Sequence, residues 1–245
     1  MDKATPSTDI AAGSTIPESM ETTHYSAMDK LGNTVGITTT INLSYGNKKI
    51  VDGAGFLLNN EMDDFASSPG SQNAFGLIGY EANSIKPAKR PLSSMSPTIV
   101  LTPEGEPLMT IGAAGGSRII TTVLQVIISV VDHNLSVQDA INLGRTHSQW
   151  IPDVIRYEGK NKMNTEFNQF LPSLSEKQIS ELEELDHKFE DGNVESGMYY
   201  LARAHGIMYK NGQFFTGVDW RGNGEISDGI TSVSYTHLTL PTICS

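Results

Sequence analysis

Two adjacent threonines, Thr22 and Thr23, stand where a segment rich in Ser, Thr, Pro and Ala gives way to an alternating, strand-like pattern. A threonine hydroxyl is a poor nucleophile, but the α-amino group of an N-terminal threonine can take its proton. Such an amine has a pKa of about 7.7 to 8.0. Thr22 would gain this amine only if the bond after Glu21 were cut. The stretch is therefore a candidate self-cleavage junction, although a Thr-Thr pair also suits a strand through β-propensity alone.

A tight glycine turn at residues 112–116, Gly-Ala-Ala-Gly-Gly, leads straight into an apolar, helix-like run. Gly115 and Gly116 would present two unobstructed backbone N–H groups at a helix N-terminus, where an anion or a developing oxyanion can bind. A plain strand-to-helix corner is the alternative. The missing Lys excludes a phosphate-binding P-loop, and the spacing does not match the dinucleotide fingerprint.

Two polar loop segments carry groups that could bind opposite charges. Residues 59–64, Asn-Asn-Glu-Met-Asp-Asp, place Glu61 and Asp64 in an irregular loop where carboxylates could bind an ammonium group. Ser93 and Ser94 lie between prolines and could donate hydrogen bonds to a carboxylate. A solvated turn and an ordinary loop are the alternatives.

The remaining polar residues do not form a metal site. Residues 219–226 resemble a calcium loop, but Arg221 occupies a ligand position and Ile230 stands where the closing Glu should be. A single cysteine, Cys244, excludes a thiolate cluster and an intramolecular disulfide. The histidines are scattered without metal-type pairing, so we expect structural roles for His24, His133, His147, His187 and His205.

The elements that must position these residues are hairpins and helices. β-rich runs at 25–29 and 34–42 flank a Gly-Asn turn and predict a hairpin, and runs at 98–101 and 108–111 predict another. Apolar residues recur every fourth position in 119–131, which favours a helix. We also expect helices at 136–143 and 175–185, a strand at 154–158 and a final hairpin through 210–213. This order indicates an α+β layered fold.

Size and charge narrow the class of protein. A length of 245 residues suits one large domain or two small ones. The net charge of -11, from 17 Lys and Arg against 28 Asp and Glu, would repel a phosphate backbone, so no nucleic acid partner is expected. The longest apolar stretch, 119–131, is interrupted by polar residues and is shorter than the roughly 20 residues that span a bilayer.

The two ends differ in composition from the middle of the chain. Residues 1–20 are expected to form an arm or linker. No secretion leader begins at Met1, although Met1 could be an internal methionine of a longer chain. Residues 233–242, VSYTHLTLPT, resemble the translation of a sequencing adapter, which predicts a non-native tail at 233–245. The alternative is an ordinary C-terminal strand.

Five ordered motifs carry a resemblance to a known family. The stretches TTHYSAMDKLGN, TTTIN, LLNNEMDDF, KRPLSSMSPTIV and GAAGGSRIITTVLQVI resemble the small catalytic subunit of the γ-glutamyltransferases, also called γ-glutamyltranspeptidases or glutathione hydrolases. The resemblance runs from residue 4 to residue 229. It implies the N-terminal-nucleophile hydrolase fold, an αββα four-layer sandwich, incomplete because the large-subunit part is missing. It also divides the chain into a large-subunit tail at 1–21, the small catalytic subunit at 22–232, and the adapter-like tail at 233–245.

The resemblance implies a catalytic role for four residues. The precursor of the family cuts itself before the threonine that matches Thr22, so Glu21 and Thr22 would form the autocleavage junction. Thr22 would then be the nucleophile, with its freed amine as base. Thr40 would hydrogen-bond the nucleophile, and Gly115 and Gly116 would form the oxyanion hole.

Substrate-binding residues are implied in the same way. Asn42, Glu61 and Asp64 match positions that bind the α-amino and α-carboxyl ends of the glutamyl group, and the two acidic residues would take the ammonium. Ser93 and Ser94 match the serines that hold the α-carboxylate.

Four features depart from the family pattern. The loop 69–79 matches a substrate lid, but Phe75 stands where many bacterial members carry Tyr. The turn 112–116 replaces the commoner Ser-Pro-Gly-Gly, and residues 203–207, RAHGI, stand near a Gly-Ser-Thr-Gln type run of other members. The arginine that the family uses on the substrate carboxylate belongs to the absent large subunit.

The resemblance implies an enzyme that forms a γ-glutamyl ester on Thr22 and releases it to water, an amino acid or a dipeptide. Glutathione is the donor that the family suggests. No metal or organic cofactor is implied. The large subunit of the same precursor would be the partner in a heterodimer, at a periplasmic or extracellular location. A truncated, inactive fragment and an amino-acid-binding module are the alternative functions.

Overall fold

The computed structural model describes residues 22–68, 70–71, 73, 77–149, 153–159, 173–191 and 201–221. The predicted arm at 1–21 and the predicted tail at 233–245 therefore lie outside the described residues, as do Glu21 and Phe75. The proposed domain boundaries stay predictions.

A long hairpin begins the described chain. Strands β1 (Thr22–Met28) and β2 (Thr34–Thr40) pair antiparallel, which confirms the first predicted hairpin. At the turn, Asp29 accepts hydrogen bonds from the backbone N–H groups of Leu31 and Asn33 at 2.8 and 3.0 Å. Alternate residues of β1 are buried, so one face of the hairpin packs against the rest of the protein.

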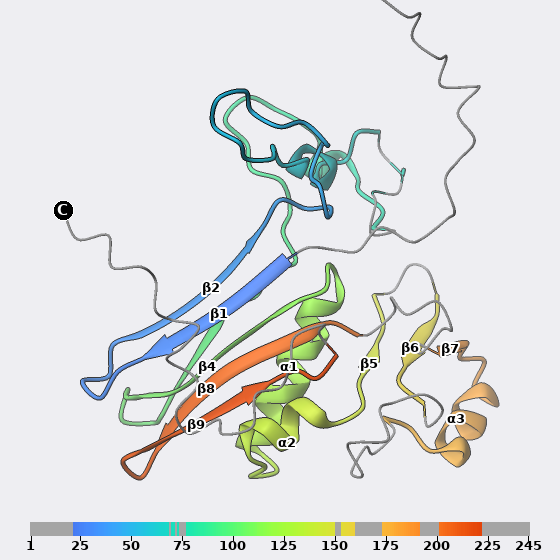
Figure 1. The fold of residues 1–245 in the computed structure, drawn as a ribbon. Helices are drawn as coiled ribbons and strands as arrows, with labels where there is room; N and C mark the ends of the chain where they lie inside the picture. The colour runs from blue at the N-terminus through green and yellow to red at the C-terminus, as the bar shows by residue number, and fades with distance from the viewer. Residues whose placement is uncertain are drawn as a thin grey trace, which may run out of the picture.

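A four-stranded antiparallel sheet forms the centre of the molecule (Figure 1). Its strand order is β3 (Thr98–Leu101), β4 (Pro107–Ala114), β8 (Arg203–Lys210) and β9 (Gln213–Val218). The predicted hairpins at 98–111 and through 210–213 are therefore both confirmed.

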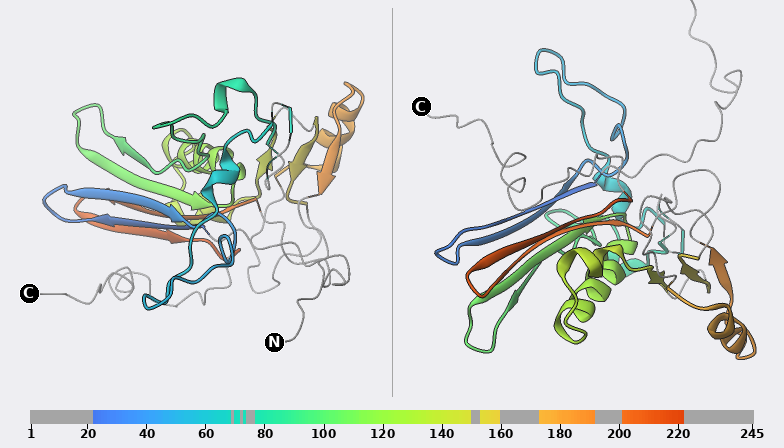
Figure 2. Two further views of the ribbon diagram at one scale, coloured as in Figure 1. Left: turned by 90° about the horizontal axis from the view of Figure 1, so that it is seen from above. Right: turned by 60° about the horizontal axis from the view of Figure 1, so that its bottom comes forward.

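The two faces of this sheet carry different layers (Figure 2). On one face, Met109, Ile111 and Ala113 belong to the buried core together with residues of α1 (Arg118–Val131) and α2 (Val137–Asn142). On the other face, a Cβ atom at Gly112 would lie 2.3 Å from the ring of His24, so the hairpin packs closely there. Helix, sheet and hairpin thus form three stacked layers.

Both predicted helices of the core are confirmed. Helix α1 begins one residue before the predicted range 119–131, and α2 is one residue shorter at each end than the predicted range 136–143. Helix α1 buries its face at Ile119, Val123, Val126 and Val130. The predicted N-cap of α2 is also found, because the Ser136 hydroxyl accepts a hydrogen bond from the Asp139 N–H at 3.0 Å.

A small third sheet lies beside the helices. It consists of β5 (Thr146–His147), β6 (Ile155–Tyr157) and β7 (Phe189–Asp191), with β6 and β7 parallel. Helix α3 (Glu176–Glu183) precedes β7 and begins with a capping box between Ser175 and Gln178. The strand predicted at 154–158 and the helix predicted at 175–185 are confirmed, whereas β7 was not predicted.

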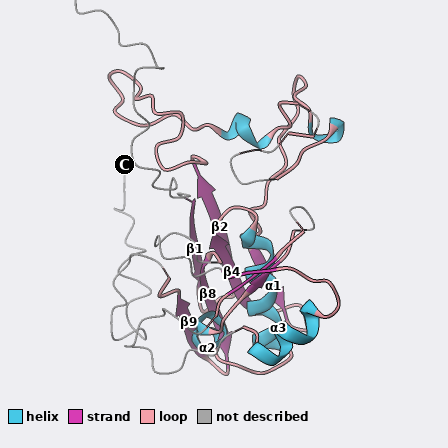
Figure 3. Cartoon of the chain, turned by 90° about the vertical axis from the view of Figure 1, so that its right-hand side faces the viewer, coloured by secondary structure: helices cyan, strands magenta, loops and turns pink. Residues whose placement is uncertain are grey.

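A long loop region connects β2 to β3 above the hairpin (Figure 3). It contains two short 3-10 helices, η2 (Glu61–Asp64) and η3 (Glu81–Asn83). No helix in the described ranges is long and apolar enough to cross a membrane.

Candidate active site

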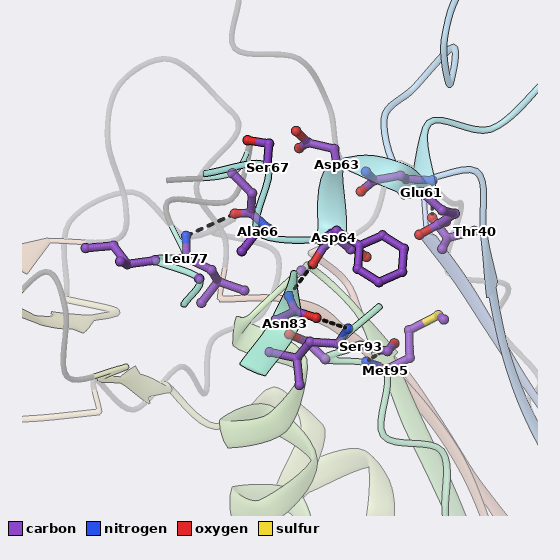
Figure 4. Close-up of a pocket in the computed structure, with 18 of the residues that line it drawn as sticks. Thr40, Glu61, Asp63, Asp64, Ala66, Ser67, Leu77, Asn83, Ser93 and Met95 are labelled. Carbon is purple, nitrogen blue, oxygen red and sulfur yellow. Dashed lines mark hydrogen bonds between the residues drawn. The ribbon is translucent and has the colours of Figure 1, made fainter. Parts of the chain in front are cut away.

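A pocket opens where the end of the hairpin, the long loop region and the N-terminus of α1 meet (Figure 4). Its walls contain most of the residues that the sequence singled out. The lining includes Thr22, Thr40, Asn42, Glu61, Asp64, Ser93, Ser94 and Gly116. These residues lie up to 94 positions apart in sequence, and the fold brings them to one cavity.

The Thr22 hydroxyl is held at the edge of this pocket. Strand pairing places Thr22 opposite Thr40, and the Thr22 hydroxyl donates to the Thr40 hydroxyl at 3.1 Å. The Thr40 oxygen also accepts the backbone N–H of Asn42 at 2.8 Å, which fixes its orientation. The Asn42 side chain donates to the Asn60 carbonyl at 3.2 Å. The hydrogen bond expected between Thr40 and Thr22 is therefore present.

The glycine turn adjoins the same cavity. Gly115 has a φ of 147° and Gly116 a φ of 59°, conformations that glycine adopts without strain. A Cβ atom at Gly115 would lie 2.6 Å from the Cα of Ala202, so no side chain fits there. Since Gly116 precedes α1 and lines the pocket, the positive end of the α1 dipole faces the site.

Two carboxyl groups lie together on η2. Burial, followed by the charge of Asp64 and a hydrogen bond between the two side chains, raises the pKa of Glu61 to about 7. Burial also raises the pKa of Asp64, while the hydrogen bond from Glu61 opposes that rise. Glu61 Oε1 is buried without a hydrogen-bond partner among the described residues. The pair is thus an acceptor site suited to a cation.

The opposite wall of the pocket carries hydroxyl groups. Ser93 is exposed and Ser94 half-buried. The Ser93 oxygen accepts the backbone N–H of Met95 at 3.2 Å, which leaves the Ser93 hydrogen available to a ligand. Phe75 lies outside the described residues, as does part of the predicted lid at 69–79.

His24 lies two residues after Thr22 on the same buried face of β1. Its ring contacts the Thr38 hydroxyl at 2.8 Å and the Ser26 hydroxyl at 3.0 Å. Burial, and to a smaller extent the charge of His205, lower the pKa of His24 to about 4. The neutral ring links β1 to β2, which is the structural role expected for it. The described residues contain no group of three or more His, Cys, Asp or Glu that could hold a metal ion.

A buried network of four charged residues was missed by the sequence analysis, which considered Arg221 only as a defect in a calcium loop. Arg145 donates to Asp219 at 2.7 Å, and Arg221 donates to Glu158 at 2.6 Å and to Asp219 at 3.1 Å. All four side chains are at most 2% exposed. No periodicity marks these residues, so the sequence offered no signal.

This network supports the glycine turn from behind. The Arg145 guanidinium donates to the carbonyl groups of Leu201 and Ala202 at 3.1 and 2.9 Å. Ala202 is the residue that lies against Gly115. The Thr122 hydroxyl of α1 also donates to the Leu201 carbonyl, at 2.8 Å. The buried charges therefore hold the segment against which the turn packs.

Solved structures of other proteins define the class to which this fold belongs. A cephalosporin acylase from Bacillus halodurans aligns over 78% of this chain and 31% of that chain, with a TM-score of 0.59 and 20% identity. A γ-glutamyltranspeptidase mutant from Helicobacter pylori aligns over 82% of this chain and 100% of that chain, with a TM-score of 0.70 and 42% identity. The chain has the α+β fold of the N-terminal-nucleophile hydrolases, as predicted, in incomplete form.

Sequence comparison gives the family within this class. The γ-glutamyltranspeptidase family model matches residues 1–229, and the chain belongs to the γ-glutamyltranspeptidase family. The glutathione hydrolase proenzyme of Escherichia coli K12 is 50% identical over 159 residues, which are 64% of this chain and 27% of that relative. The resemblance drawn from five motifs is confirmed. The chain spans 27% of the length of this relative.

Proposed function

We propose that the protein containing this chain hydrolyses and transfers γ-glutamyl groups, with glutathione as a donor, through a γ-glutamyl ester on Thr22. The observation that carries the proposal is one pocket that combines a threonine hydroxyl pair with a carboxyl pair and a serine pair. Family membership and the name of the Escherichia coli relative, a glutathione hydrolase, support the same activity.

The two polar walls fit the two charged groups on the α-carbon of a glutamyl substrate. Glu61 and Asp64, the ammonium arm of the pocket, would bind the α-ammonium. Ser93 and Ser94, the carboxylate arm, would donate hydrogen bonds to the α-carboxylate. Binding at both arms would hold the γ-carbonyl carbon beside the Thr22 hydroxyl, and such positioning lowers the entropic part of the barrier.

The chemistry would proceed in two steps. In the first, the amine of mature Thr22 takes the hydroxyl proton, the oxygen attacks the γ-carbonyl carbon, and the amide C–N bond breaks as the leaving amine accepts the proton. In the second, the Thr22 amine takes a proton from water or from the amine of an acceptor, which attacks the ester carbon; the C–O bond to Thr22 breaks, and the proton passes to the Thr22 oxygen, which regenerates the hydroxyl. The N–H groups of Gly115 and Gly116 would stabilise the oxyanion in both steps, and losing one such donor typically costs about 2.7 to 4 kcal/mol in barrier.

Maturation and partnership follow from the same proposal. Thr22 has an α-amino group only after the bond to Glu21 is cut, and the Escherichia coli relative is likewise named a proenzyme. The large subunit would supply further layers of the sandwich and the arginine for the substrate carboxylate. Periplasmic or extracellular location remains part of the proposal.

The test replaces each threonine of the pair in the full-length protein. Thr22→Ala is expected to abolish both self-cleavage and hydrolysis of a chromogenic γ-glutamyl anilide. Thr23→Ala is the matched control, because Thr23 is exposed on the opposite face of β1 and should leave both reactions intact. Full activity of Thr22→Ala would contradict the proposed role of its hydroxyl.

A further inference from the structure

One side chain connects the two arms of the pocket, and nothing in its local sequence marks it as a site residue. The Asn83 Nδ2 donates to the Asp64 carbonyl at 2.7 Å, and the Asn83 Oδ1 accepts the Leu92 N–H at 3.0 Å. Asp64 belongs to the ammonium arm, and Leu92 directly precedes Ser93 of the carboxylate arm. Figure 4 shows Asn83 between Asp64 and Ser93, with both hydrogen bonds drawn.

The Asn83 side chain is held in a fixed orientation. Both polar atoms of its amide are used, one as a donor and one as an acceptor, and Asp or Leu at this position could not make both bonds. Its backbone is also fixed, because the Asn83 carbonyl accepts the Ala66 N–H at 3.0 Å and the Asn83 N–H donates to the Tyr80 carbonyl at 2.8 Å.

The turn that carries Asn83 is braced by a lysine. Lys89 Nζ donates to the carbonyl groups of Ala82 and Ser84, at 2.7 and 2.9 Å, on either side of Asn83. These hydrogen bonds hold η3 in place within the loop region. Among the described residues, η3 pairs with no strand of the three sheets. The amide therefore acts as a spacer between two segments that are 19 and 9 residues away from it in sequence.

We propose that Asn83 is a positioning residue that sets the separation between the ammonium arm and the carboxylate arm, and thereby determines specificity for donors that carry both α-substituents. This inference rests on the proposed function. The ammonium and the carboxylate of a glutamyl group sit on one carbon, so their separation is fixed by covalent geometry. A pocket that binds both must match that separation, and an error of about 1 Å can cost on the order of 100-fold in rate.

Three substrates separate this role from a general structural one. A γ-glutamyl anilide uses both arms, a glutaryl anilide lacks the α-amino group, and a 4-aminobutyryl anilide lacks the α-carboxylate. For Asn83→Ala in the full-length protein, kcat/KM for the γ-glutamyl anilide should fall about 10- to 100-fold, mainly through KM. The kcat/KM values for the two one-armed anilides should stay unchanged, because a single arm does not depend on the separation.

Asn47→Ala is the matched control variant. The Asn47 Oδ1 also accepts a backbone N–H, from Lys49 at 3.0 Å, but Asn47 is exposed and does not line the pocket. All three kcat/KM values should be unchanged in this variant.

Asn83→Asp gives a second, independent test, which also serves if Asn83→Ala does not fold. It keeps the acceptor for the Leu92 N–H, removes the donor to the Asp64 carbonyl, and adds a negative charge near the ammonium arm. Positioning predicts a higher KM for the γ-glutamyl anilide, whereas a purely electrostatic effect predicts a lower one. A lower KM, or an equal loss of kcat/KM on all three anilides, would overturn the inference. Wild-type protein that fails to hydrolyse the γ-glutamyl anilide would instead contradict the proposed function.

Discussion

At the scale of single residues, the raised pKa of Glu61 predicts that ligand binding at the carboxyl pair depends on pH. The pKa of Glu61 is raised to about 7, so Glu61 keeps its proton below that pH and is ionised above it. The ionised pair attracts an ammonium group more strongly than the half-protonated pair. Binding of an α-amino acid should therefore tighten as pH rises through about 7.

The inhibition constant of L-glutamate measures this effect on binding separately from any effect on the catalytic steps. For the wild-type protein, the inhibition constant should decrease by up to about tenfold for each unit that the pH rises toward 7, and it should stay constant at higher pH. Glu61→Gln keeps a side chain that can bond to Asp64 but removes the titration, so its inhibition constant should be flat over the same range. An identical pH profile for the two proteins would show that Glu61 does not control binding.

Residue type marked Thr22 as a candidate self-cleavage site, and the family resemblance added Thr40 as its hydrogen-bond partner. Thr22 and Thr40 each stand at the expected end of a strand, and pairing brings their hydroxyl groups together. Asn83 could not be foreseen, because its importance depends on contacts with two distant segments of an irregular loop. Nothing in the sequence distinguishes it from an ordinary loop asparagine.

At the scale of elements, the four buried charges join three separate segments of the chain. Arg145 follows α2, Glu158 follows β6, and Asp219 and Arg221 follow β9. Each charge has a partner of opposite sign at hydrogen-bond distance, which offsets the cost of removing it from water. Removing one partner would leave an uncompensated charge in the interior.

Arg145→Met is therefore expected to lower the free energy of unfolding by about 3 to 5 kcal/mol. Arg156→Met is the control, because Arg156 pairs with Glu190 at 2.9 Å in a more exposed position, and losing such a pair typically costs about 0 to 1 kcal/mol. Urea denaturation of the two full-length variants gives both values. Equal, small losses would show that the network does not stabilise the fold.

Local patterns in the sequence located most elements but not their connections. The alternating, β-rich pattern of residues predicted the hairpins, and the recurrence of apolar residues at every fourth position predicted α1. Strand β7 was not predicted, because it has only three residues, Phe-Glu-Asp. It also pairs in parallel with β6, from which it is far away in sequence. The loop region between β2 and β3 has no period, so its folding around η2 and η3 depends on tertiary contacts.

At the scale of the whole molecule, one face of the hairpin is not covered by any of the described elements. Tyr25, Val35 and Ile37 are 39 to 45% exposed on the side away from the four-stranded sheet. The αββα sandwich of the class requires a further helical layer over such a face. In the proposed heterodimer, the large subunit would supply this layer.

This arrangement predicts different effects for two aspartate substitutions in the full-length protein. Ile37→Asp should place a charge in the subunit interface and release the large subunit during gel filtration. Leu31→Asp should leave the heterodimer intact, because Leu31 lies at the tip of the hairpin turn and is 88% exposed. Equal retention of the large subunit by both variants would place the interface elsewhere.

In the proposed function, Thr22 becomes an N-terminus and carries the glutamyl group during turnover. Mass spectrometry of the active, full-length protein, quenched while it consumes a γ-glutamyl substrate, tests this directly. We expect a chain that begins at Thr22, with its N-terminal peptide heavier by one glutamyl group. An active protein whose chain is uncut before Thr22, or one that carries the glutamyl group on another residue, would contradict it.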